Sequence, residues 1–183
     1  MELWDAYNKN EEKVGVDLVR GRDIPKGLYH LVAEVLVQHK DGTYLLVKRD
    51  DSKETYPGYE DFGAVGSVLK GETASQAAYR ELKEETGIIA RRLKPLCHLI
   101  SESKQTIYYG YLCITDCPKN SIRLQEGETS AYRWISKEEM LAFFNSNQII
   151  PTRKLHLEDY IEYLCGKEIG GEEKENATED LTT

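Results

Sequence analysis

The chain has 183 residues, of which 40% are hydrophobic, and a net charge of −8, which suits one folded domain. No apolar run approaches the ~20 residues of a membrane span, and the N-terminus lacks the basic start and apolar stretch of a signal peptide. We therefore expect a cytoplasmic protein with no membrane partner.

Half of the net charge falls on residues 166–183, which hold six acids and two lysines. This segment lacks apolar periodicity, so we expect an acidic disordered tail after a domain formed by residues 1–165. The domain itself is mildly acidic. It is therefore a poor partner for nucleic acid, whose binding depends on neutralising phosphates. A small anionic substrate that arrives with a divalent cation is compatible with this charge.

The first 49 residues predict two β-hairpins. An N-terminal hairpin and loop occupy residues 1–27, with a polar turn at residues 8–13. Residues 28–38 form a β-rich run, the Asp41-Gly42 turn follows, and residues 43–49 return beside it. Arg49 ends this hairpin and is a candidate for contact with a substrate phosphate. A salt bridge to Asp50, Asp51 or Asp61 is the alternative.

Residues 50–65 are expected to form a loop, with a turn at residues 56–59. The aromatic side chains of Tyr56, Tyr59 and Phe62 are candidates to stack on a base or to line a substrate pocket. The alternative is that they pack the following loop onto the sheet.

Residues 73–86 predict a helix that starts with a capping box of Thr73 and Gln76 and ends at Gly87. Small apolar residues at helical spacing give it a face that can lie close to a sheet. The carboxylates of Glu81, Glu84 and Glu85 share another face, where like charges repel. Either this is a solvated acidic face, or a hard cation such as Mg²⁺ lies among the oxygens.

The second half of the chain predicts a hairpin over residues 96–115, a strand over 129–135, and two helices. The first helix starts at Ser136. The second covers residues 152–165, with Leu155, Tyr160, Ile161 and Leu164 facing the body. The tyrosines between residues 108 and 111 alternate, so at least one should point towards the substrate.

The segment from Gly66 to Ile88 resembles the Nudix signature at every specified position: Gly, five residues, Glu72, seven residues, Arg80-Glu81-Leu82, one residue, Glu84-Glu85, one residue, Gly87 and Ile88. The resemblance implies the Nudix α/β/α sandwich with a mixed β-sheet over residues 1–165. It also implies a divalent-metal enzyme that cleaves a pyrophosphate linked to another group. By resemblance, Glu81, Glu84 and Glu85 hold the metal and Gly66 lets the loop approach it, while Arg80 and Glu72 brace the loop.

The late segment also resembles many Nudix enzymes, in which a loop glutamate acts as general base or as a further metal ligand. Glu126 or Glu128 is the candidate here, and Glu84 or Glu85 is the base if it comes from the helix. A solvated acidic loop is the alternative.

Segments between residues 4 and 49 are similar to the Nudix branch related to isopentenyl-diphosphate isomerase. In true isomerases a histidine at the place of His30 binds metal, whereas in related hydrolases it is packed or hydrogen-bonded. Isomerase chemistry uses a cysteine and a histidine where this chain has Val65 and Ser67, which argues against it. A non-catalytic sensor of a nucleotide ligand is a second alternative, although such regulators usually lose metal ligands and carry a DNA-binding segment. Removal of a cap from RNA is a third, and it would need a basic groove.

We therefore expect a Mg²⁺-dependent hydrolase, with Mn²⁺ as a substitute, that cleaves a nucleoside diphosphate linked to another moiety. The sequence does not identify the moiety that is linked to the nucleoside diphosphate. The oligomeric state stays open, with a homodimer through the N-terminal hairpin as one arrangement.

Overall fold

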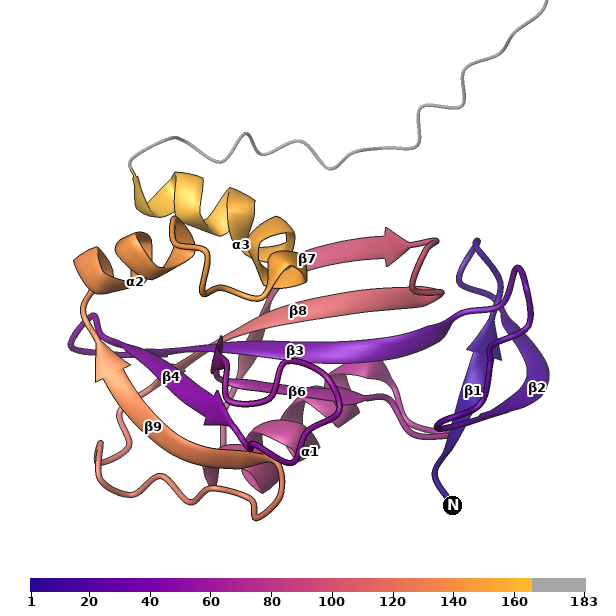
Figure 1. Ribbon diagram of the computed structural model, residues 1–183, viewed down its shortest axis with the longest axis horizontal. Helices are drawn as coiled ribbons and strands as arrows, with labels where there is room; N and C mark the ends of the chain where they lie inside the picture. Colours follow the sequence, from indigo (N-terminus) through magenta and orange to yellow (C-terminus); the bar gives the residue numbers. More distant parts are fainter. Residues whose placement is uncertain (166–183) are drawn as a thin grey trace, which may run out of the picture.

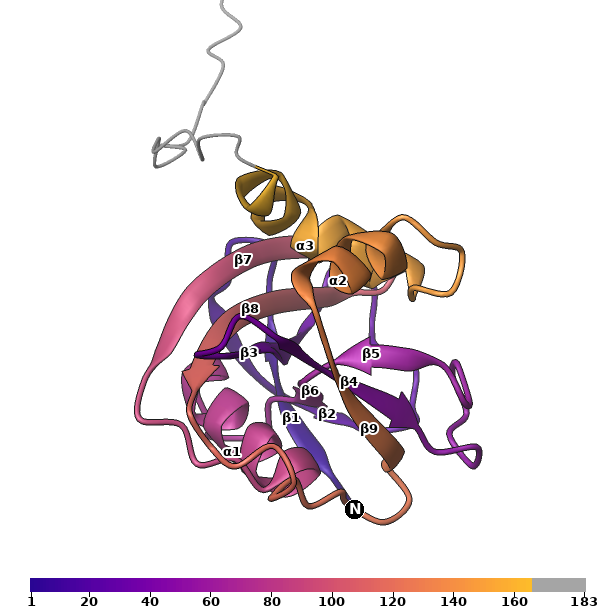
Figure 2. The ribbon, with the colours of Figure 1, turned by 90° about the vertical axis from the view of Figure 1, so that its left-hand side faces the viewer.

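The computed structural model describes residues 1–165, so the predicted disordered tail lies outside the described residues. A mixed sheet lies between α1 on one face and α2 and α3 on the other (Figures 1 and 2). The helices span Ala74–Thr86, Lys137–Phe144 and Pro151–Leu164. The expected α/β sandwich with a mixed sheet is confirmed.

The sheet is built around β3, in the order β5-β4-β3-β8-β7, with β6 also paired to β3 and β9 to β4. Only β3 and β8 pair in parallel; the other strand pairs of the described sheet are antiparallel. The strands are β3 (His30–His39), β4 (Tyr44–Arg49), β5 (Glu60–Phe62), β6 (Ala64–Ser67), β7 (Leu93–Ser101), β8 (Thr106–Thr115) and β9 (Thr129–Ile135).

The predicted hairpin of residues 28–49 forms only next to its turn. Gln38 pairs with Tyr44, but residues 32–35 of β3 pair with β6 instead of β4. The displaced β4 pairs with β5 and β9. The expectation of a loop over residues 50–65 was therefore wrong for its second half, which supplies β5 and the start of β6.

Alternation along β3 divides the core in two. Leu31, Ala33, Val35 and Val37 face α1, whereas Leu36 faces α2 and α3. Because successive side chains of a strand point to opposite faces, one strand supports both helical layers. Glu34, on the α3 side, is a charged group in this buried strand.

The capping signals were predicted correctly. Thr73 and Gln76 form the capping box of α1, and Gly87 ends the helix with φ of 74°. A second capping box of Ser136 and Glu139 starts α2. The predicted inner face of α3 needs a correction, because Leu155 is 61% exposed. Arg153, which follows Pro151 at the start of α3, is buried instead.

The N-terminal hairpin consists of β1 (Leu3–Tyr7) and β2 (Lys13–Val19), as predicted, and forms a separate two-stranded sheet. It joins the main sheet through a bridge between Tyr7 and Tyr29. The carboxylate of Asp5 accepts a hydrogen bond of 2.7 Å from the amide of Gly71. The hairpin is therefore fixed to the loop that leads into α1. Among residues 1–165, no helix is long and apolar enough to cross a membrane.

Candidate active site

The carboxylate of Glu81 lies against the backbone of Gly66, where α1 packs beside β6. A Cβ atom added to Gly66 would lie 1.9 Å from the carboxyl carbon of Glu81. No side chain larger than hydrogen fits without displacing that carboxylate. The close approach of the two elements therefore depends on glycine at this position.

Arg80 connects the loop before α1 to the helix. Its Nε and Nη2 donate to the two carboxylate oxygens of Glu72 at 2.8 and 2.9 Å, and Nη2 also donates to the Ser67 carbonyl at 3.0 Å. Its Nη1 donates to Glu81 at 2.5 Å and, more weakly, to Glu84 at 3.3 Å. The hydrogen bonds from Arg80 hold the pKa of Glu72 below its usual range. The guanidinium thus has little freedom to leave this position.

Glu85 is the most buried carboxylate of the motif, with 6% of its surface exposed. Its Oε2 accepts a 3.2 Å hydrogen bond from the amide of Val65. Burial, followed by the negative charge of Glu81, raises the pKa of Glu85 to about 8. Burial likewise raises the pKa of Glu81, although Arg80 opposes this effect. A bound cation would therefore stabilise the charged form of both acids, which burial disfavours.

The donor set of Glu81, Glu84 and Glu85 fits a hard divalent cation, which prefers carboxylate oxygens and keeps positions open for water and phosphate. In residues 1–165, no three acidic, histidine or cysteine side chains already converge closely enough to hold a metal ion. The side chains are near one another but held by protein partners. Binding of a cation therefore requires small side-chain movements.

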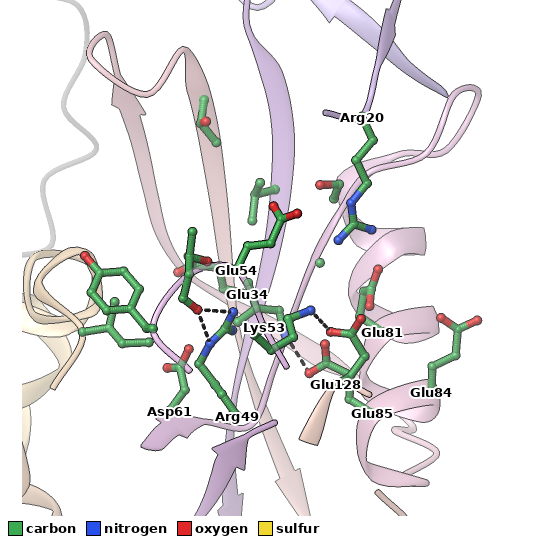
Figure 3. A pocket seen from close by; sticks show the side chains of 18 of the residues that line it. Arg20, Glu34, Arg49, Lys53, Glu54, Asp61, Glu81, Glu84, Glu85 and Glu128 are labelled. Carbon is green, nitrogen blue, oxygen red and sulfur yellow. Dashed lines mark hydrogen bonds and ion pairs between the residues drawn. The ribbon is translucent and has the colours of Figure 1, made fainter. Parts of the chain in front are cut away.

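These carboxylates open onto a cavity of about 870 Å³. Figure 3 shows Glu81, Glu84 and Glu85 on the helix side, with Glu128 beside them. The cations Arg20, Arg49 and Lys53 also line the cavity. Arg20 pairs with Glu2 at 2.8 Å, and Lys53 forms an ion pair with Glu128. The cavity thus has acids for a metal and cations for an anionic substrate.

Arg49 does not form any of the three predicted salt bridges. Its Nε and Nη2 donate to the carbonyl of Thr55 at 3.2 and 3.0 Å. The side chain lines the cavity without a carboxylate partner among residues 1–165. Its charge is consequently available to a ligand.

The structure brings most of the predicted site residues to this cavity. Its lining includes Arg49, Gly66, Arg80, Glu81, Glu84, Glu85 and Glu128. Glu126, the other candidate base of the late loop, is exposed and lies outside the lining. Tyr108 of β8 does line it, as expected for one of the alternating tyrosines.

Two predicted substrate residues lie elsewhere, and their assignment is corrected. Phe62 is 3% exposed, and its ring packs edge-on against Phe143 at 5.4 Å in the core. Tyr59 is 42% exposed and lies outside the lining of the large cavity. Tyr56, the third aromatic candidate, does line the cavity. The sequence position of an aromatic residue near the motif does not show whether its side chain points into the cavity, into the core or to solvent.

His30 is packed as the related hydrolases suggest. Its ring stacks on Trp4 with centroids 4.3 Å apart, and its Nε2 lies 3.0 Å from the Thr106 hydroxyl. Burial lowers the pKa of His30 to about 4. The ring is therefore neutral near pH 7.

Sequence reasoning missed a buried charged group on the α3 side of the cavity. Arg153 pairs with Glu34 of β3 and Asp61 of β5, and His156 lies 2.8 Å from Glu34. Burial alone would raise the pKa of Glu34, but Arg153 and His156 together lower it. These residues come from distant parts of the chain. The one local sign of the cluster is a charged residue, Glu34, in a strand expected to be buried.

The NUDIX domain model matches residues 28–155 of the chain. The chain belongs to the Nudix family. It is 38% identical over 156 residues to an uncharacterized Nudix hydrolase, lmo0368, of Listeria monocytogenes, covering 82% of this chain and 89% of that protein. It is 31% identical over 141 residues to the uncharacterized Nudix hydrolase YfcD of Escherichia coli, covering 76% and 77% of the two chains. These relatives and the intact motif identify a Nudix hydrolase, a class that generally uses divalent metal ions.

Solved structures support the fold. The Deinococcus radiodurans protein DR0079 superposes with a TM-score of 0.68 at 21% identity, covering 90% of this chain and 98% of that one. The NUDIX domain of Shewanella oneidensis NrtR, solved with ADP ribose, gives a TM-score of 0.58 at 18% identity, covering 80% and 93%. Both similarities are similarities of architecture.

Proposed function

We propose that this Nudix hydrolase cleaves the phosphoanhydride bond of a nucleoside diphosphate linked to another moiety, with Mg²⁺ as its metal. The observation that carries the proposal is the cavity of about 870 Å³, whose lining has the motif carboxylates and Glu128 together with the cations Arg20, Arg49 and Lys53. A diphosphate needs both kinds of charge, because its oxygens bind cationic side chains and a metal at once. Mn²⁺ should substitute, since it also prefers oxygen ligands.

Glu81, Glu84 and Glu85 would hold the metal. When bound, it would neutralise phosphate charge and lower the pKa of a coordinated water. Gly66 and Arg80 position the carboxylate of Glu81, as their contacts describe. Glu84 is the most exposed of the three carboxylates and so the freest to turn towards a ligand.

Glu128 is our candidate for the residue that accepts the proton of the attacking water. It lines the cavity and lies near enough to Glu81 and Glu85 to raise the pKa of both. Glu126 is outside the cavity lining, and Glu84 and Glu85 are assigned to the metal. Arg49, which lacks a carboxylate partner among residues 1–165, would bind a phosphate oxygen of the substrate.

The substrate is expected among nucleoside diphosphates joined to a sugar, a coenzyme or phosphate. ADP ribose belongs in the panel because the NrtR domain is solved with it. The resemblance of the front segment to the isomerase branch stays a prediction, so isopentenyl and dimethylallyl diphosphate complete the panel. The cytoplasmic location and the homodimer also stay predictions.

The test measures release of phosphate or mononucleotide from each compound with Mg²⁺, with EDTA, and with the Glu85→Gln variant. Turnover of one class that disappears with EDTA and in Glu85→Gln supports the proposal. Glu138→Gln, a change of the same kind on the exposed start of α2, is the matched control and should keep full activity. Ligand binding without turnover of any compound would contradict hydrolysis and favour the sensor.

A further inference from the structure

The ion pair of Lys53 and Glu128 joins two loops that line the cavity. Lys53 lies between β4 and β5, and Glu128 directly precedes β9, 75 residues later. Their side chains are 16% and 32% exposed, so both are partly withdrawn from water. Figure 3 shows the pair beside Glu81 and Glu85. No motif predicted it.

Backbone contacts fix the two loops independently of this pair. The amide of Asp50 donates to the carbonyl of Glu128 at 2.9 Å, and the amide of Lys53 donates to the carbonyl of Asp50 at 3.2 Å. The hydroxyl and amide of Ser52 both donate to Asp50 Oδ1. The lysine side chain can therefore leave Glu128 without releasing the loops from each other.

The cation of the Nudix motif has no such freedom. Arg80 contacts Glu72, Glu81 and the Ser67 carbonyl together, so it stays in place when a ligand arrives. Lys53 has Glu128 as its sole ion-pair partner within residues 1–165. It is also a flexible point charge, which suits exchange between two anions.

We propose that Lys53 is a positioning residue that exchanges partners during the reaction cycle. Without ligand it holds Glu128 in an ion pair beside the metal carboxylates. When a divalent cation enters, Glu128 leaves Lys53 and turns to the metal-side water, and when a diphosphate follows, Lys53 binds one of its phosphate oxygens. This inference rests on the proposed function.

Removal of the Lys53 charge should have opposite effects on the binding of the metal and of the substrate. A cation must compete with Lys53 for Glu128, so removing the lysine should tighten metal binding. A partly buried pair worth about 1 kcal/mol corresponds to roughly fivefold in the dissociation constant. The same change removes a phosphate contact, so the substrate KM should rise by about tenfold. A merely structural salt bridge predicts neither the opposite signs nor their dependence on Glu128.

The experiment titrates Mn²⁺ by electron paramagnetic resonance, without substrate, into wild type, Lys53→Gln, Glu128→Gln and the double variant. We expect tighter binding in Lys53→Gln, and we expect the same lysine change to have no effect once Glu128 is replaced. Tightening that persists in the Glu128→Gln background would mean simple charge repulsion and would overturn the proposal, as would no tightening at all. Lys48→Gln, outside the cavity lining and paired at 3.7 Å with Asp51, controls for net charge.

The KM of the substrate found above is then compared for wild type, Lys48→Gln and Lys53→Gln. A raised KM in Lys53→Gln alone supports the second half of the exchange, and an unchanged KM overturns it. Failure of the proposed function is distinguishable, because it would appear as absent Mn²⁺ binding or absent turnover in the wild type. Failure of the partner exchange would leave Mn²⁺ binding and turnover of the wild type intact and would appear only in the Mn²⁺ affinity or the KM of the variants.

Discussion

Arg153 of α3 donates its Nε hydrogen to Oδ1 of Asp61 in β5 at 2.8 Å, in a site where both residues are almost fully buried. The same guanidinium pairs with Glu34 of β3. One cation therefore compensates two buried acids and ties the last described helix to two strands beside the cavity.

Replacement of Arg153 by methionine should destabilise the fold strongly. It leaves Glu34 and Asp61 buried without their cation, which costs about 3–5 kcal/mol of unfolding free energy. Urea unfolding monitored by circular dichroism measures this. Arg133→Met is the matched control, because its pair with Glu60 is exposed and worth at most about 1 kcal/mol. Equal costs for the two variants would contradict a special role for the buried pair.

Gly66→Ala should weaken metal binding while leaving the fold in place. The added methyl would overlap the Glu81 carboxylate, which must then rotate out of the site. We expect Mn²⁺ binding weaker by at least about tenfold, or ~1.4 kcal/mol. Ser67→Ala, the next residue of β6, keeps the backbone carbonyl that Arg80 uses and should bind Mn²⁺ normally. Unchanged Mn²⁺ affinity in Gly66→Ala would show that the close approach is not needed.

His30 should make the protein less stable in mild acid. Burial lowers its pKa from the ordinary 6.5 to about 4, so the unfolded chain binds a proton that the folded ring does not. Its contribution to stability is full above pH 6.5 and is lost progressively as the pH falls to about 4. The loss amounts to at most about 3 kcal/mol.

Urea unfolding at a series of pH values between neutral and mildly acidic measures the effect. The His30→Gln variant cannot titrate, so its stability should fall less steeply over this range than that of the wild type. Parallel curves for wild type and His30→Gln would rule out the ring as the source.

The elements that could be predicted are those with a local signal. Thr73, Gln76 and Gly87 mark the ends of α1, and the Nudix signature marks the carboxylates of the face that lines the cavity. The pairing of β6 with β3 could not be predicted, because a four-residue strand has too little periodicity to stand out from a loop.

The missed part of the site consists of contacts between distant residues. Lys53 and Glu128 are 75 positions apart, and Arg153 and Asp61 are 92 apart. Such pairs carry no local pattern in a single sequence. Phe62 was assigned to the substrate because it stands near the motif, yet on β5 its side chain points to the α2 side of the sheet.

The most direct test of the central claim is hydrolysis of the best substrate in ¹⁸O-labelled water, followed by mass spectrometry of the products. Metal-assisted attack of water should give one ¹⁸O atom in a single phosphate product, Mg²⁺ dependence of its appearance, and loss of both product and label in Glu85→Gln. Turnover that continues in EDTA, or products without label in their phosphates, would contradict metal-assisted attack of water on a phosphoanhydride.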